Sequence, residues 1–260
     1  MKTRRVKTLA QYVSNVGEVR RQWARGGKAQ ELWFRGINDR SLSILPGAVW
    51  REDCDDVSMF NMFQRDAPAY LSPPPVDEWS WYFAAQHYGL PTRLADWSAS
   101  PLISLFFALQ GVSDGACPCV WMMDAGKLNK ITQGDDEVYV AGLRFSEHWL
   151  PSHVSSGEPT KTFQYDGKTF SNELPIALQP YRTTPRIIAQ QGVFTVHGSG
   201  TASLEEIFEA GEKSDQQLAR IDLEDVPRLT DELEAFGFDA FTVFPEVDKL
   251  AERLKRQYQP

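Results

Sequence analysis

One stretch near the middle of the chain carries most of the side chains that could do chemistry. Residues 86–101 read Gln-His-Tyr-Gly-Leu-Pro-Thr-Arg-Leu-Ala-Asp-Trp-Ser-Ala-Ser-Pro. These side chains include groups that transfer protons, bind anions and stack on flat rings. An almost unbroken apolar run, Leu102 to Leu109, follows directly. A dense polar segment that stops where a buried element begins is typical of a site presented on a rigid scaffold.

Each of these side chains has a functional and a structural interpretation. His87 and Tyr88 could hydrogen-bond a substrate hydroxyl, and the ring of Tyr88 or Trp97 could stack on nicotinamide or adenine. His87 could instead be a core histidine bonded to a backbone carbonyl, with the aromatic residues as packing. Arg93 could present its guanidinium to a pyrophosphate, or pair with Asp96 and only stiffen a loop. The residue types leave both interpretations open.

The end of this stretch predicts the start of a helix. Ser98 or Ser100 is suited to cap it, and Pro101 suits its first position. The same helix terminus would offer free N–H groups and the positive end of a dipole to an anion. A cap and an anion site are compatible at this point.

Two further segments contain candidate ligand-binding groups. Arg35 is expected at the end of a strand beside Gly36, where its guanidinium could grip a phosphate or ribose hydroxyls and the glycine could let a ligand approach the backbone. The alternative for Arg35 is an ordinary salt bridge. Arg186 and Gln191 precede a predicted strand, and an amide there could bond to ribose but cannot act as a general base.

Together these segments resemble the FRG domain family, named for a Phe-Arg-Gly triplet. Residues 33–36 read Trp-Phe-Arg-Gly, and residues 86–97 fit a second block of the form Gln-His-x-Gly-x-Pro-Thr-Arg-Leu-x-Asp-Trp. A third block at residues 186–194 and a closing one at 233–245 follow in the family's order. The resemblance covers about residues 30 to 250, so we expect a basic N-terminal helical segment at 1–30 and an FRG-like domain at 31–260.

The order of these blocks is also similar to the three-part layout of ADP-ribosyltransferases. That layout implies a split sheet in which Arg35 holds NAD, Ser98 and Ser100 order the pocket, and Gln191 lies where the family has an acid. The reaction needs a carboxylate beside the nicotinamide ribose, so another acid, Glu173 or Glu206, would have to supply it.

The resulting hypothesis is an enzyme that uses NAD as its substrate. It would move ADP-ribose to a nucleic acid (RNA or DNA) or to a protein, as a bacterial toxin or phage-defence effector with a neutralising antitoxin as partner. The alternative is a non-catalytic FRG module that binds a nucleotide or a partner. The hypothesis names two sets of residues: catalytic Arg35, His87 and Gln191, and ligand-binding Arg35, Gly36, Tyr88, Arg93, Trp97, Ser98, Ser100 and Arg186.

The pattern of apolar residues predicts an α+β domain. Strands and helices are mixed without strict alternation, which favours a mixed, mainly antiparallel sheet flanked by helices over a doubly wound sheet. The expected helices are 7–24, 53–71, 77–88, 101–109, 186–191, 227–236 and 246–258. The expected strands are 31–37, 119–124, 176–181, 193–197, 217–223 and 240–244. Residues 86–97 apart from the helix end are expected to be a loop.

Composition limits the cellular setting and the partners. The 260 residues are 42% hydrophobic with a net charge of −8, and no apolar run is long enough to cross a membrane. Three cysteines cannot all pair, which favours a reduced, cytoplasmic setting. Histidines 148, 153 and 197 have no partners at metal-ligand spacing, so no metal site is expected. Residues 1–31 carry a surplus of six positive charges on an acidic body, which suits phosphate contact or a solvated helix face.

Overall fold

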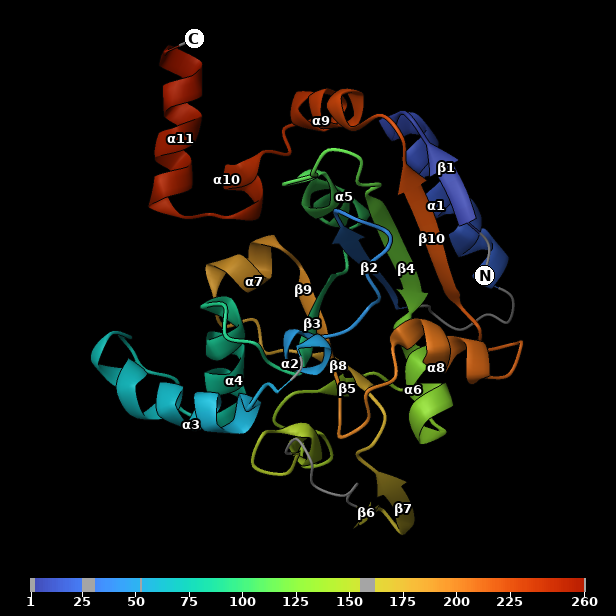
Figure 1. Cartoon of the computed structure of the whole chain (residues 1–260), viewed down its shortest axis with the longest axis vertical. Coiled ribbons are helices and arrows are strands. Elements are labelled where there is room, and N and C mark those ends of the chain that lie inside the picture. The colour runs from blue at the N-terminus through green and yellow to red at the C-terminus, as the bar shows by residue number, and fades with distance from the viewer. Residues whose placement is uncertain (1–2, 25–30, 52, 155–161, 260) are drawn as a thin grey trace.

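A single mixed sheet runs through the molecule, a computed structural model that describes residues 3–24, 31–51, 53–154 and 162–259 (Figure 1). Its eight strands lie in the order β1-β10-β4-β2-β3-β9-β8-β5. The two edge pairs, β1 with β10 and β5 with β8, are parallel, and all other neighbours are antiparallel. The expected α+β fold with one mixed, mainly antiparallel sheet is therefore confirmed.

The strands are short and come from the whole length of the chain. The sheet consists of β1 (Thr3–Val6), β2 (Leu32–Ile37), β3 (Leu94–Ser98), β4 (Cys119–Asp124), β5 (Tyr139–Val140), β8 (Ile176–Gln179), β9 (Gly192–Val196) and β10 (Leu218–Leu223). A separate hairpin is formed by β6 (Thr162–Tyr165) and β7 (Lys168–Ser171).

Helices cover both faces of the sheet. They are α1 (Leu9–Trp23), α2 (Gly47–Trp50), α3 (Asp56–Asp66), α4 (Glu78–His87), α5 (Pro101–Leu109), α6 (Ala125–Gln133), α7 (Pro185–Ala189), α8 (Leu204–Ala210), α9 (Val226–Ala235), α10 (Ala240–Val243) and α11 (Val247–Tyr258), with 3-10 turns η1 (Ala67–Ala69) and η2 (Ser146–Trp149). One face carries α1, α5 and α9 over one half of the sheet and α4 over the other half. The opposite face carries α6 and α8.

Helix α5 packs against the sheet more closely than any side chain at residue 36 would allow. A Cβ built on Gly36 would lie 1.9 Å from the carbonyl oxygen of Ser104 and 2.5 Å from the backbone nitrogen of Ala108. The Ser104 hydroxyl donates to the Phe34 carbonyl at 2.9 Å, which fixes this approach. Ser100 caps the helix by accepting from the Ile103 amide. Gly36 therefore serves helix–sheet packing, because the space in front of its Cα is filled by α5.

Helix α6 was not predicted, and two short segments were assigned to the wrong element. Residues 94–98, expected as a loop, form the central strand β3, and residues 240–244, expected as a strand, form the short helix α10. Short apolar runs do not distinguish helix from strand by pattern alone. At α10 the deciding group is Asp239, whose side chain caps the helix by accepting from the Thr242 amide at 2.9 Å.

The basic N-terminal segment belongs to the same body as the rest. Residues Thr3–Val6, within the segment expected to be helical, form edge strand β1 beside β10. Arg4 lies 2.5 Å from Glu18, and Arg5 and Lys7 lie 3.6 and 3.7 Å from Glu224. The expected helix stop at residues 26–27 and the domain boundary at residue 30 lie outside the described residues. Within the described ranges, no helix has the length and apolar character needed to span a membrane.

Candidate functional site

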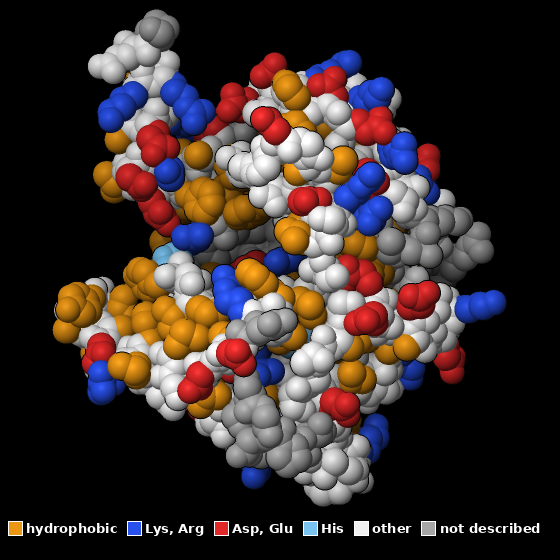
Figure 2. All heavy atoms as spheres, in the orientation of Figure 1, with side chains coloured by type: hydrophobic (Ala, Val, Ile, Leu, Met, Phe, Trp, Pro, Cys, Tyr) orange, Lys and Arg blue, Asp and Glu red, His pale blue; other side chains and the backbone are white. Residues whose placement is uncertain are grey.

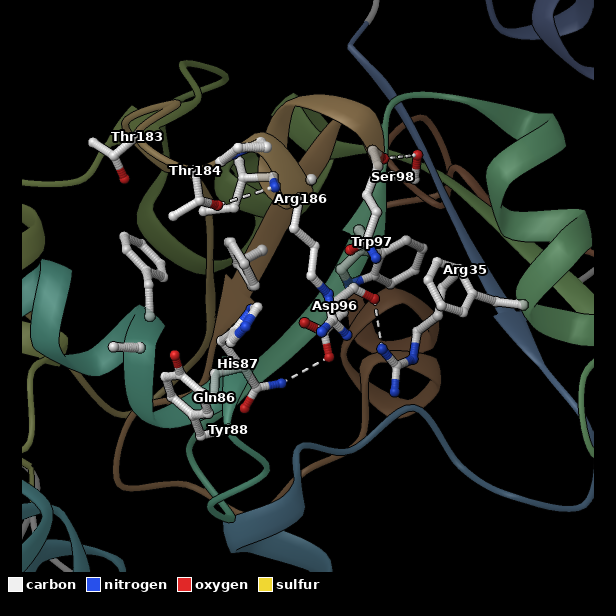
Figure 3. Close-up of a pocket in the computed structure, with 18 of the residues that line it drawn as sticks. Arg35, Gln86, His87, Tyr88, Asp96, Trp97, Ser98, Thr183, Thr184 and Arg186 are labelled. Atoms are coloured by element: carbon white, nitrogen blue, oxygen red, sulfur yellow. Dashed lines mark hydrogen bonds between the residues drawn. The ribbon is translucent and has the colours of Figure 1, made fainter. Parts of the chain in front are cut away.

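A large cleft opens on one face of the sheet, between α4 and α5. Its volume is about 1500 Å³, and its wall draws on β2, β3, α4, α5, α7 and the segment that leads into α11. Figure 3 shows Arg35, Asp96, His87 and Arg186 around this one cleft, although they are far apart in the sequence. The three segments that the sequence analysis singled out thus converge on a common hollow.

The floor of the cleft lies where two central strands separate. β2 and β3 share a single register pair, Phe34 with Ser98. Past this pair, the Arg35 guanidinium enters the gap, and its Nη1 donates to the Asp96 carbonyl at 2.5 Å. Among the described residues, the buried Nε of Arg35 has no partner. Burial lowers the pKa of Arg35, and the carboxylates of Asp96 and Glu205 oppose this shift. Arg35 therefore retains a donor for a ligand.

Asp96 places an exposed carboxylate in the cleft. Strand β3 alternates, so Asp96 points to the same face as Ser98 and towards α4. Its Oδ2 accepts from Gln86 Nε2 at 2.7 Å. One of the two interpretations of Arg93 paired it with Asp96 inside a loop. That interpretation was wrong, because the segment is a strand that turns these two side chains to opposite faces.

A hydrogen-bond chain of fixed direction leads to that carboxylate. The Leu94 amide donates to Thr92 Oγ1 at 3.1 Å, so the Thr92 hydroxyl hydrogen is free to donate to Gln86 Oε1 at 2.5 Å. The Gln86 amide nitrogen then faces Asp96. Because an amide nitrogen only donates, Asp96 Oδ2 is the acceptor at the end of this hydrogen-bond chain. The second sequence block contains Gln86, Thr92 and Asp96, and this chain of hydrogen bonds explains their spacing.

Arg93 has a structural role in place of the expected ligand contact. It is 4% exposed and does not line the cleft. Its Nε donates to the buried Asp56 carboxylate at 2.8 Å, and its Nη1 donates to the Gly198 carbonyl at 2.6 Å. This pair ties α3 to the end of β9, and with it the outer wall of the cleft.

The two other candidates on β3, Trp97 and Ser98, point to opposite faces of the sheet. Trp97 is one of the residues of the cleft wall, but it is only 3% exposed. Its side chain packs among apolar residues on the far face and its Nε1 donates to Thr195 Oγ1 at 3.2 Å, so its ring is not available for stacking. Ser98 reaches the cleft wall, but its hydroxyl donates to the Gln190 carbonyl at 2.7 Å. Ser100 caps α5 and is absent from the described cleft wall, as are residues 101–103 of that helix. The expected anion site at this helix terminus is therefore not part of the cleft.

His87 and Tyr88 are both exposed in the cleft, at the end of α4. Partial burial and the Arg186 charge lower the pKa of His87, while Glu246 opposes this shift. Arg186 lies over the Phe244 ring at 4.8 Å and 3.7 Å from the Glu246 carboxylate. An imidazole, a guanidinium and a carboxylate from three elements thus meet at the cleft mouth.

The amide that faces the cleft is Gln190 and not the expected Gln191. Gln191 adopts a left-handed turn with φ of 45°, is exposed, and accepts from the Ala99 amide through its carbonyl, outside the described cleft wall. Gln190 lines the cleft, and its Nε2 is buried with no partner among the described residues. Glu206 accepts from Ser203 in a helix cap, and Glu173 is also outside the wall.

Two carboxylates that line the cleft, Asp96 and Glu246, were missed as site residues by sequence reasoning. The signal for Asp96 was present in the alternating pattern of residues 94–98, but it is too short to exclude a loop. No local signal marks Glu246, since the fold alone brings α11 towards α7.

Comparison with known families agrees with this geometry. The family model of the FRG domain matches residues 30–116. The chain contains an FRG domain. The match runs from β2 to the loop after α5, so it includes Arg35, Gly36 and the chain of hydrogen bonds that leads to Asp96.

The FRG match covers only one side of the cleft. The blocks at residues 186–194 and 233–245, which also fit the family's order, lie beyond the matched range. Neither the curated proteins nor the solved structures compared with the chain gave a match. The FRG domain thus supplies the floor and the α4 wall, and the wall with Arg186, Gln190 and Glu246 comes from the rest of the chain.

Proposed function

We propose that this FRG-domain protein uses NAD to transfer ADP-ribose to an acceptor, with Asp96 as the essential carboxylate. The observation that carries the proposal is the Asp96 side chain, exposed on the floor of the cleft and held as an acceptor by Gln86. The proposal moves the acid from the expected Glu173 or Glu206 to Asp96, on the strand beside Arg35.

The size and the donors of the cleft fit a dinucleotide. Pockets for small ligands usually enclose about 300–1000 Å³, and this cleft of about 1500 Å³ has room for NAD and for part of an acceptor. Two buried nitrogens, Arg35 Nε and Gln190 Nε2, need acceptor atoms, which phosphate and ribose oxygens would supply. Phe83 and Phe194 stack at 5.0 Å in the same wall and offer an apolar surface to a ring.

Each polar group then has a defined task. Cleavage of the bond between nicotinamide and ribose develops positive charge on the sugar, which a nearby carboxylate stabilises. Asp96 would face that charge, with Gln86 holding one carboxylate oxygen and the other oriented to the cleft. Arg35 and Gln190 would bind the anionic and hydroxyl groups, and Tyr88 is accessible for stacking. His87, with its lowered pKa, would be a neutral acceptor for the proton that the attacking group loses.

We propose that the protein acts as an effector in the cytoplasm. None of the three cysteines forms a disulfide in the part of the chain that the structure describes, which suits a reducing compartment. Modification of a cellular acceptor would make the protein a toxin or a phage-defence effector, controlled by a neutralising partner.

The proposal is tested by incubating the protein with NAD that carries a label on its adenylate half. We expect free nicotinamide and labelled acceptor in a cell extract, with protease or ribonuclease treatment showing which class of acceptor carries the label. Asp96→Asn should lower transfer at least about 100-fold while leaving NAD binding, measured by calorimetry, within a few-fold.

The matched control is Asp114→Asn, at an exposed turn outside the cleft wall. It should transfer as the parent does. Full activity of Asp96→Asn would refute the assigned carboxylate. Binding of NAD without release of nicotinamide would instead favour a non-catalytic nucleotide-binding module.

A further inference from the structure

We infer that the acceptor is a polypeptide, and that an uncharged, aromatic segment of it docks on the outer rim of the cleft. This inference rests on the proposed function for its acceptor role, but the docking surface stands on its own geometry. Five large apolar side chains of the cleft wall are more than half exposed: Leu42 at 54%, Trp50 at 59%, Tyr70 at 86%, Val76 at 91% and Tyr88 at 59%. We call these five residues the aromatic platform.

All five platform residues belong to the wall of the cleft. Figure 2 shows hydrophobic side chains gathered over α3 and α4, beside the hollow below α10. Large exposed apolar patches on soluble proteins usually mark interaction sites. Trp and Tyr are also the residue types that contribute most binding energy at protein interfaces. The composition therefore fits a protein-binding surface.

Two of the platform rings, Trp50 and Tyr88, contact neighbouring side chains before any partner binds. Arg51 lies 4.3 Å above the Trp50 ring, and the Tyr88 ring contacts both His87 at 4.8 Å and Phe63 at 6.3 Å. Between Tyr70 and Val76, three consecutive prolines restrict the backbone. Because these two rings already have contacts, immobilising them on binding would cost little conformational entropy.

Charge argues for a polypeptide over a nucleic acid. Residues 67–76 carry no charged side chain, and the charged groups of the described cleft wall are two arginines, Arg35 and Arg186, and two carboxylates, Asp96 and Glu246. Nucleic-acid sites need several cations in register with phosphates. Apart from Arg51, which stacks on Trp50, the platform has no charged neighbour among the contacts described above, and one cation beside a balanced cleft does not provide them.

The basic N-terminal segment does not change this conclusion. Strand β1 is an edge strand, separated from β2 by β10 and β4, and α1 packs beside it (Figure 1). Arg4 is paired with Glu18 and also donates to Asn15. The positive charges on β1 and α1 therefore lie away from the cleft, where they cannot align a phosphate backbone across the platform.

The docking surface is tested with short random peptides displayed on phage and selected on the full chain without NAD. We expect enriched peptides rich in aromatic residues, aliphatic residues or proline and poor in charge. Synthetic fluorescent copies should bind the parent, and the double variant Tyr70→Asp/Val76→Asp should weaken binding at least about tenfold. Binding of fluorescent homopolymer RNA oligonucleotides, measured by fluorescence anisotropy as for the peptides, should be the same for the parent and the double variant.

The matched control is Phe236→Asp, which changes an apolar residue 74% exposed at the end of α9, outside the cleft wall. It should bind the selected peptides as the parent does. The inference would be overturned if no selected peptide bound the parent better than the double variant. It would also be overturned if the parent bound RNA and the double variant did not. Peptide binding together with no release of nicotinamide would refute the proposed function and leave the platform standing.

Discussion

Arg35 and Arg93 come from the two family blocks and both were expected to hold a phosphate, yet the molecule uses them in different ways. Arg93 is buried, and its guanidinium bonds a carboxylate at 2.8 Å and a carbonyl at 2.6 Å. Arg35 bonds one backbone carbonyl, keeps a buried Nε without a partner among the described residues, and lines the cleft. An arginine's role thus depends on whether the fold gives it a carboxylate.

The largest expected effect concerns Arg93. Replacement by Met would leave the Asp56 carboxylate buried without its guanidinium, and removal of one partner of a buried pair typically costs about 3–5 kcal/mol. We expect Arg93→Met to lower the free energy of unfolding by that amount, measured by urea denaturation.

The double variant Asp56→Leu/Arg93→Met should recover part of the loss, because no unpaired buried charge remains. Arg182→Met, an exposed arginine outside the cleft wall, is the control. If Arg93→Met were as stable as the parent, the structural role of this pair would be wrong.

Gly36 belongs to the cleft wall, but we expect its larger contribution to be to helix–sheet packing. Gly36→Ala would push a Cβ to 1.9 Å from the Ser104 carbonyl, and only backbone movement of α5 could relieve the clash. Overpacking of this kind costs up to about 3 kcal/mol. Thermal and urea unfolding would measure the loss.

The matched control is Gly115→Ser, since a Cβ there meets nothing within 4 Å, although the positive φ of 81° adds some strain. A Gly36→Ala variant as stable as the parent, with reduced NAD affinity, would instead support direct ligand approach at this glycine.

For Arg35 we expect a small effect on stability and a larger effect on NAD binding. Arg35→Met removes one hydrogen bond to a carbonyl, so we expect the unfolding free energy to change by no more than about 1.5 kcal/mol. Loss of a charged donor should weaken NAD binding by about 1.5–3 kcal/mol, or roughly 10–100-fold, in calorimetry. Unchanged NAD affinity in a folded Arg35→Met protein would remove this residue from the site.

His197 offers the smallest and most selective test, because both arginines act on it. It is fully buried, its ring nitrogens have no partner among the described residues, and burial, then Arg93 and Arg35, lower its pKa from 6.5 to about 3. Between these values the unfolded state binds a proton that the folded state does not, so stability falls as pH falls, by about 1.4 kcal/mol per pH unit.

Comparison of urea unfolding at pH 8 and pH 5 measures this loss. In His197→Leu the difference between the two pH values should shrink by about 2 kcal/mol. His87→Ala, at an exposed site, is the control and should keep nearly the parent's difference. An equal acid loss in the parent and in His197→Leu would show that His197 titrates normally.

The sequence predicted most elements because their signals are local. Asp77 caps α4, Ser100 and Pro101 start α5, and the apolar run of β4 was placed at its observed bounds. It failed at β3, because a five-residue segment between a helix stop and a helix cap carries too little pattern to separate strand from loop. That one error reversed the roles of Arg93, Asp96 and Trp97, since alternation in a strand decides which side chains reach the cleft.

Residue types and their order alone identified an FRG domain, the mixed α+β fold and the segments that meet at the cleft. Which atoms are free for a ligand was decided only by tertiary structure: Asp56 neutralises Arg93, α5 fills the space before Gly36, and α7 turns Gln190 and not Gln191 inward. Local propensity acts between near neighbours in the chain, whereas the availability of a donor or a carboxylate depends on partners far away in sequence.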